Sequence, residues 1–219
     1  MNEIRESKKL LKIVVEVMIC LLIAIILVGL IQQFFLAPVA VVGESMLPTI
    51  NSSGDKVYVQ RKLYKLSRGD VVVFYRPNSD KVTAKNPASS ITIADFFNSL
   101  PFVNKIPKVS EESASDYTCV IKRVIGMPGD TIEIREVSPS HAQLFRNGSL
   151  VNDFTMQPRK FAGVGVKEGL WTVGDGELFV LGDNRNNSYD SEDYGPIKDS
   201  WLMGKVILAK IGGKYKFHL

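Results

Sequence analysis

The chain has 219 residues, of which 45% are hydrophobic and 23% are charged. This balance is typical of a folded protein and excludes a disordered one. The formal net charge of +4 suggests nucleic-acid binding at first sight, but part of it stands in one cluster before a long apolar run. The cluster consists of Arg5, Lys8, Lys9 and Lys12. Its position fits the cytoplasmic end of a membrane helix better than a phosphate-binding patch, so we expect no nucleic-acid partner.

The apolar run at residues 13–36 is about long enough to cross a bilayer as a helix. A signal peptide that is removed is the alternative. Removal requires small residues at the last and third-last positions before the cut, and at the two candidate sites Phe35 or Pro38 would stand third-last. We therefore expect an uncleaved, single-pass anchor, with residues 1–12 in the cytoplasm and a catalytic domain at 38–219 outside the cell membrane.

The chain is poor in residues that bind metals. Cys20 lies within the apolar run and Cys119 lies far downstream, so a disulfide would join the bilayer interior to the domain, and we expect two free thiols. The two histidines, His141 and His218, form no cluster with ligand spacing. The acidic run at 183–193 lacks the ligand pattern and the turn glycine of a calcium loop. We expect neither a metal nor an organic cofactor.

After the apolar run, short β-branched segments alternate with turn-forming residues, which predicts a mostly β, sheet or barrel-like domain. Strands are expected at 56–60, 70–76, 119–126, 131–137, 177–182 and 205–211. The segment at about 138–175 is interpreted as a small inserted β subdomain. A variable insert at 78–117 mixes polar residues with an apolar patch at 93–103. The sequence leaves open whether this patch is a membrane-surface helix, a flap or a partner site.

The candidate chemistry is a serine activated by an amine. A histidine-dependent serine hydrolase fits poorly, because the GESML segment around Ser45 lacks the closing glycine of a nucleophile elbow. A lysine can act as the base if apolar neighbours lower its pKa. In an alternating strand, Lys122 shares a face with Val120 and Val124. On the strand pattern alone, however, an ordinary lysine on a sheet edge is the better interpretation.

Four blocks extend this pattern. They read GESMLPT, RGDVVVFYRP, VIKRVIGMPGD and GDNRNNSYDSEDYGP, in this order within residues 42–196. Their sequence and order resemble those of the type I signal peptidases, the membrane-anchored serine-lysine proteases of bacteria, and the Gram-positive enzymes in particular. Each block is moderately specific, and the four together are strongly so.

The resemblance implies roles for individual residues. Ser45 is then the nucleophile and Lys122 the general base. Ser188 matches a serine that hydrogen-bonds the lysine amine, while Asp190 and Arg123 match a supporting ion pair. No carboxylate is expected close enough to Lys122 to raise its pKa again.

The resemblance also implies an extended substrate that pairs beside the strand leading into Ser45 and the strand preceding Lys122. The expected substrate-binding residues are Val41, Val42, Met46, Pro48, Val120 and Ile121. Thr49 belongs to the first block, and its hydroxyl is expected to cap the following turn. The implied partners are signal peptides of exported preproteins, membrane lipid and nearby export machinery. Shallow pockets should favour small residues at the last and third-last positions of the signal peptide, as in Ala-x-Ala.

Three positions depart from the pattern of similar sequences. Gly43 stands where some relatives, chiefly Gram-negative ones, carry a serine that helps to form the oxyanion hole, so backbone N–H groups, chiefly that of Ser45, would have to suffice. Asn186 replaces a common aspartate, and Glu192 replaces an arginine found in many relatives. These two changes put the network behind Asp190 in doubt.

Two other functions fit parts of the sequence. A non-catalytic membrane-anchored module that assists pilus or secreted-protein assembly would be expected to lose the serine or the lysine, and this chain retains Ser45, Lys122 and Ser188. An autocleaving repressor-type protease shares the dyad but should be soluble and carry a DNA-binding helix pair. The sequence does not tell which preproteins are cut, whether the role is general or specialised, or the oligomeric state.

Overall fold

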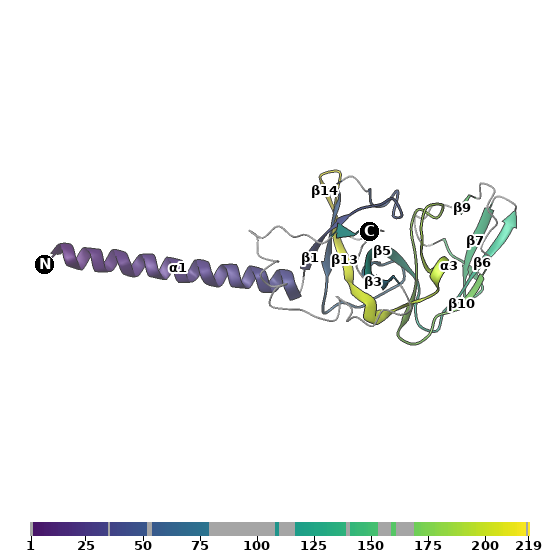
Figure 1. Cartoon of the computed structure of the whole chain (residues 1–219), viewed down its shortest axis with the longest axis horizontal. Coiled ribbons are helices and arrows are strands. Elements are labelled where there is room, and N and C mark those ends of the chain that lie inside the picture. Colours follow the sequence, from purple (N-terminus) through teal and green to yellow (C-terminus); the bar gives the residue numbers. More distant parts are fainter. Residues whose placement is uncertain are drawn as a thin grey trace.

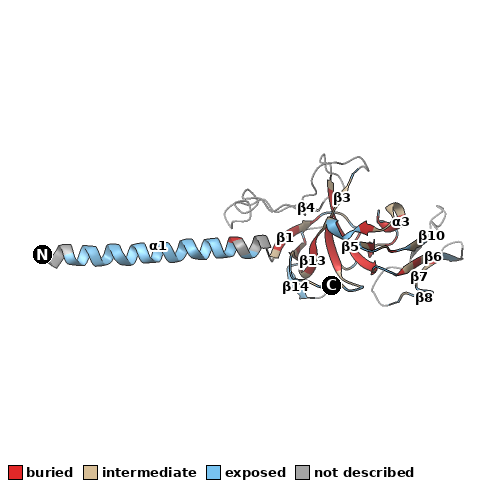
Figure 2. Cartoon of the chain, turned by 90° about the horizontal axis from the view of Figure 1, so that it is seen from below, coloured by how far each residue is buried: buried red, intermediate tan, exposed pale blue. Residues whose placement is uncertain are grey.

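A long helix, α1 (Asn2–Phe34), projects from a β domain (Figure 1). The computed structural model describes residues 2–34, 36–51, 54–78, 108–109, 117–138, 141–152, 159–160, 169–217 and 219. Within α1, Arg5–Gly29 is long and apolar enough to cross a membrane. Figure 2 shows residues 5–28 exposed, because the domain does not cover them, while Gly29 at the end of this stretch is buried. An apolar surface of this extent needs a lipid environment.

The main sheet has nine strands in the order β12-β11-β5-β3-β13-β2-β1-β4, with β14 beside β13. Their bounds are β1 Leu36–Val41, β2 Lys56–Gln60, β3 Val71–Pro77, β4 Lys108–Val109, β5 Tyr117–Gly126, β11 Glu177–Leu181, β12 Ile197–Lys198, β13 Leu202–Ile211 and β14 Lys214–Phe217. Neighbouring strands are antiparallel, except that β4 is parallel to β1. A short helix, α3 (Ser191–Tyr194), and a 3₁₀ turn, η2 (Asp199–Trp201), flank β12.

Strand β5 lies at the centre of the domain and is buried along almost its whole length. One face of the sheet packs into a first core that contains Ile121, and the other packs into a second core that contains Val120 and Val124. The alternation expected for this strand is therefore confirmed. A strand covered on both faces gives its side chains fixed and dry surroundings.

A second sheet comprises β6 (Thr131–Ser138), β7 (His141–Arg146), β8 (Ser149–Leu150), β9 (Arg159–Lys160) and β10 (Gly169–Thr172). It begins earlier than the inserted subdomain expected at about 138–175, because β6 pairs with β7 and β10 instead of joining the main sheet. A third core links the two sheets through Ile125 of β5, Ile132 of β6 and Phe179 of β11.

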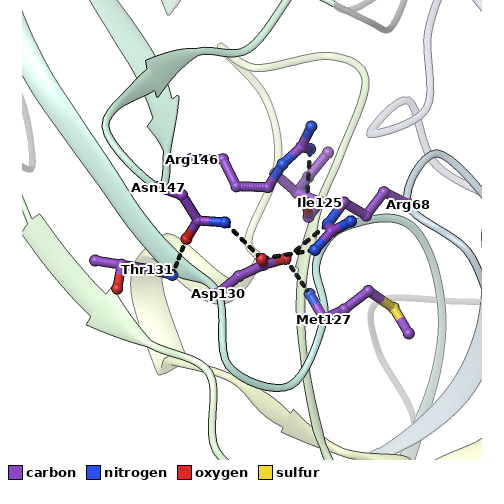
Figure 3. Close-up of polar contacts among 7 residues, drawn as sticks. All are labelled: Arg68, Ile125, Met127, Asp130, Thr131, Arg146 and Asn147. Atoms are coloured by element: carbon purple, nitrogen blue, oxygen red, sulfur yellow. Dashed lines mark hydrogen bonds and ion pairs between the residues drawn. The ribbon is translucent and has the colours of Figure 1, made fainter.

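Asp130, just before β6, ties the two sheets together (Figure 3). Its carboxylate accepts two hydrogen bonds from Arg68, at 2.8 and 2.7 Å, and others from the Met127 N–H and the Asn147 side chain, at 2.8 and 2.9 Å. Burial alone would raise the pKa of Asp130, but these hydrogen bonds and the Arg68 charge outweigh it and lower the pKa to about 2. The carboxylate of Asp130 in the MPGD segment thus holds this segment against Arg68 of the RGD segment.

The expected strand positions all carry strands in the structure, and the mostly β class is confirmed. The two cysteines are free thiols, as expected. Cys119 is buried, and burial raises the pKa of its thiol to about 12. The apolar patch at 93–103 lies outside the described residues.

Candidate active site

Lys122 occupies the middle of β5, with 1% of its surface exposed. It pairs across the sheet with Val72 of β3, and its neighbours along the same face are Val120 and Val124. These three valines and Val180 of β11 belong to the second apolar core. An ammonium group is costly in such surroundings, because burial in a low dielectric disfavours the charged form of an amine. The position therefore suits a lysine that works as a neutral base.

Ser45 lies in a tight turn directly after β1, and it is 7% exposed. Gly43 opens the turn with a φ of 101°, a backbone conformation that residues with a side chain rarely adopt. The turn is then closed by hydrogen bonds from the Leu47 N–H to the Glu44 carbonyl, at 3.1 Å, and from the Ile50 N–H to the Met46 carbonyl, at 2.9 Å. These hydrogen bonds fix the backbone on both sides of Ser45.

The segment after β11 connects the serine turn to the lysine strand. Leu181 pairs with Arg123, so the next residue, Gly182, lies level with Lys122 on β5. A Cβ added at Gly182 would lie 2.6 Å from the Ser45 carbonyl oxygen and would overlap the Ser188 hydroxyl. The backbone of Gly182 therefore lies directly between the Ser45 turn and the strand that carries Lys122.

Asn184 fastens the serine turn to the same segment. Its N–H donates to the Ser45 carbonyl at 2.9 Å, and its side-chain amide donates to the Glu44 carbonyl at 3.1 Å. Both bonds act on the backbone, so they leave the Ser45 hydroxyl available for chemistry. Asn184 was not predicted from the sequence, although it stands in the last of the four blocks.

Arg123 forms its buried ion pair with Asp183, which corrects the expected pair with Asp190. The Arg123 Nε and Nη2 atoms lie 2.8 and 2.5 Å from the two Asp183 carboxylate oxygens. Its Nη1 atom donates to the Gly69 carbonyl and to a main-chain oxygen of Leu219, at 2.7 and 2.9 Å. Arg123 therefore braces three separate segments against the strand of Lys122.

Thr49 donates a hydrogen bond from its hydroxyl to Asp183, while its expected role as a cap of the following turn stays a prediction. Asp183 was not predicted as a site residue. The signal was present in the sequence, since Asp183 is the first carboxylate after a run of strand-forming residues and the second residue of the last block. Through Thr49, the same carboxylate that holds Arg123 also holds the turn of Ser45.

Asp190 lies behind Lys122 and is fully buried. It accepts hydrogen bonds from the Gly182 N–H at 2.9 Å and from the Glu192 N–H at 3.2 Å, and it caps α3. Burial raises the pKa of Asp190 to about 6, although the Gly182 N–H, the Ser188 hydroxyl and the charge of Lys122 oppose this rise. The expectation of no carboxylate near Lys122 is therefore corrected. Ser188 lies between Gly182 and Asp190.

The expected substrate-binding residues divide into two groups. Val41, Met46 and Ile121 are buried in the first core, and Val120 is buried in the second. Val42 is 45% exposed, and Pro48 is exposed as well. The described site thus offers Val42 and Pro48 as accessible apolar side chains close to Ser45.

Strand β4 lies where the substrate strand was expected. It pairs with Ala40 and Val41 of β1 in parallel, and it also contacts β5. This strand comes from the insert at 78–117, which the four blocks skip. Among the described residues there is no group of three or more His, Cys, Asp or Glu side chains that could hold a metal ion.

Comparisons with known proteins identify the family of this chain. A family model described as signal peptidase, peptidase S26, matches residues 14–210. Signal peptidase I of Mycobacterium tuberculosis is 29% identical over 216 residues, covering 91% of this chain and 70% of that protein. Signal peptidase I S of Bacillus subtilis is 29% identical over 221 residues, covering 96% and 90%. Because the family model spans most of the sequence, this chain belongs to the signal peptidase family, peptidase S26.

Proposed function

We propose that this chain is a membrane-anchored serine endopeptidase that removes signal peptides from exported preproteins with Ser45 as nucleophile and Lys122 as general base. The observation that carries the proposal is the burial of Lys122 among apolar side chains, level with the glycine that touches Ser45. Family membership supports the reaction, and the site supports the assignment of the two residues.

The reaction proceeds in two halves. Neutral Lys122 accepts the Ser45 hydroxyl proton as the serine oxygen attacks the scissile carbonyl carbon, and the lysine then gives that proton to the departing amine. The acyl-enzyme ester that remains is attacked by water, which passes a proton to Lys122. Lys122 then gives this proton to the Ser45 oxygen as that oxygen leaves the acyl group, which restores the free enzyme. The oxyanion of each tetrahedral intermediate is stabilised by the Ser45 backbone N–H, since Gly43 offers no hydroxyl.

The supporting residues hold this geometry without taking part in bond making. Asp183 fixes Arg123 and Thr49 on the two sides of the site. Ser188 lies beside Gly182 and Asp190, and we infer that the Lys122 amine donates a hydrogen bond to the Ser188 hydroxyl, which orients the amine. Small residues at the last and third-last positions of the signal peptide suit the crowded turn beside Val42 and Pro48.

The membrane orientation follows from the charge cluster. Residues 1–12 lie in the cytoplasm, the rest of α1 crosses the cell membrane, and the domain faces outward, near the export machinery that delivers preproteins. The outer face of β1, β2, β13 and β14 supports contact with lipid. Its cross-strand row is formed by Pro38, Tyr58, Leu208 and Phe217. Phe217 is 69% exposed, and the row begins shortly after α1 ends.

Protease added to intact spheroplasts tests the orientation. The domain should be digested while a tag placed before residue 5 stays protected. Protection of the domain with loss of the tag would reverse the proposed topology.

Cleavage is tested with the detergent-solubilised full chain and a secretory precursor that carries Ala-x-Ala. Mass analysis should show one cut directly after the second alanine. The matched controls are the Ser45→Ala enzyme and a precursor with phenylalanine in place of that alanine, and neither should yield product. Specific precursor binding by the wild-type chain without cleavage would favour a non-catalytic assembly module.

A further inference from the structure

The loop that carries Ser188 is closed by a buried ion pair that the reaction itself does not use. Arg185 and Glu192 form this pair, with 6% and 5% of their side chains exposed. Arg185 stands two residues after Asp183, and Glu192 stands two residues after Asp190. The pair therefore joins the two ends of the loop whose middle carries Ser188.

The ends of this loop are also the parts that meet the catalytic residues. At its start, Asp183 holds Arg123, and Asn184 holds the Ser45 carbonyl. At its end, Asp190 lies behind Lys122 and receives a hydrogen bond from the Glu192 N–H at 3.2 Å. A displacement of Glu192 would therefore move the Asp190 carboxylate, which lies next to Lys122.

We propose, on the basis of the function proposed above, that Arg185 and Glu192 are a positioning pair that holds Ser188 and Asp190 against the lysine base. Two buried charges contribute little net stability, because the cost of desolvating them offsets their attraction. Removing one partner leaves the other charge buried and uncompensated. What the pair supplies is a fixed loop geometry, which an apolar pair would hold less specifically.

The pair also predicts the effect of a charge reversal at position 192. An arginine at this position would face Arg185 in a dry environment. Two like charges in contact repel each other strongly when water is excluded. Glu192→Arg should therefore damage the site.

A charge-swap experiment with the full chain tests the proposal. Glu192→Arg should lower kcat/KM by about tenfold or more and shift the midpoint of its pH profile, because Asp190 moves relative to Lys122. Adding Arg185→Glu to this variant should restore at least about a third of the wild-type kcat/KM, because the two opposite charges attract each other again, with their positions exchanged. The matched control is Glu133→Arg, which disrupts the exposed pair with Arg135 in the second sheet and should change neither value.

Two results would overturn the proposal. One is a Glu192→Arg variant with the wild-type kcat/KM and pH midpoint. The other is a folded charge-swapped variant that is no more active than Glu192→Arg alone. Folding is monitored by the thermal midpoint of each variant.

Carbon-13 NMR titration of the Asp190 carboxyl keeps this test separate from the proposed function. If the wild-type chain cleaves no precursor, the proposed function fails. A shift of the Asp190 titration in Glu192→Arg, with none in Glu133→Arg, would still support the positioning pair. An unchanged titration in both variants would refute it.

Discussion

Asp183 and Arg123 form a buried, two-pronged ion pair that joins the loop carrying Ser188 to the strand carrying Lys122. Thr49 donates to the same carboxylate and brings in the turn of Ser45. Three segments that are far apart in the sequence therefore meet at one side chain. Acyl transfer requires such a meeting, since nucleophile and base must stay within hydrogen-bond reach while the substrate changes shape.

Replacing either reacting group should abolish cleavage without unfolding the domain. Ser45→Ala removes the nucleophilic oxygen alone, and Lys122→Arg introduces a guanidinium that cannot release a proton at any useful pH. We expect a loss of about a thousandfold or more in kcat/KM for each variant, measured with a peptide substrate. Lys198→Arg, at an exposed site on β12, is the control and should remain active. Appreciable turnover by purified Lys122→Arg would refute the serine-lysine assignment.

The rate at limiting substrate should rise from neutral into alkaline pH. A lysine has an ordinary pKa of about 10.4, and burial among valines should lower that value for Lys122. Mutation of His141 should leave the profile unchanged. A profile that instead rises through the imidazole range and disappears with His141 would contradict the assignment.

We expect the charge of Asp190 to influence the pH at which the rate rises. Its ionised carboxylate favours the charged form of Lys122, since an opposite charge nearby stabilises the ammonium. The pKa of Asp190 is raised to about 6, so this carboxylate is ionised at neutral pH. Asp190→Asn should therefore move the alkaline rise to lower pH, while kcat falls because the loop is held less firmly. An unmoved midpoint in a folded variant would show that Asp190 and Lys122 are not coupled.

Periodicity made part of this site predictable. The run CVIKRVIG alternates with a period of two, and that period alone places Lys122 on the same face as Val120 and Val124. The membrane helix was predictable because the apolar run at residues 13–36 is about long enough to cross a bilayer. The class of the fold followed from short β-branched segments between turn residues.

Pairing between distant residues was not predictable from the sequence. A strand pattern says which face a residue occupies, but it does not name the neighbouring strand, so the pairing of β6 with β7 and β10 was not predicted. Arg123 could have paired with any of the four carboxylates in the last block, and only the path of the loop decides for Asp183. The hydrogen bond from Thr49 to Asp183 was not predictable for the same reason, because the two residues lie far apart in the sequence.

Gly182 should tolerate no side chain. A Cβ there would overlap the Ser188 hydroxyl and lie 2.6 Å from the Ser45 carbonyl oxygen, so Gly182→Ala should push the two halves of the site apart. We expect kcat/KM to fall by about a hundredfold with a smaller change in the thermal midpoint. Gly174→Ala is the control, because its Cβ would meet the flexible end of the Glu177 side chain, away from the site. Equal activities of the two variants would contradict the close approach.

Asp130→Asn should destabilise the protein in a pH-dependent way. The folded-state pKa of about 2 lies below the ordinary value of 3.8, so the unfolded chain binds more protons between these values and stability rises with pH through that window. The charged carboxylate then contributes about 2 kcal/mol above pH 4 to 5. Denaturant unfolding of both proteins should show a difference that is largest at neutral pH and shrinks toward pH 2. A difference that does not change with pH would argue against the Arg68 pairing.

The insert should supply no catalytic side chain, because all four blocks lie outside residues 78–117. Its described part, β4, occupies the edge of β1 at Ala40 and Val41, where the substrate strand is expected to pair. Replacing the insert with a short turn of glycine and serine should therefore leave kcat for a peptide unchanged and lower KM, since the β1 edge becomes free. Val109→Pro tests the strand alone, because proline has no N–H to donate and disfavours strand pairing. Loss of turnover in either folded variant would show instead that the insert completes the active site.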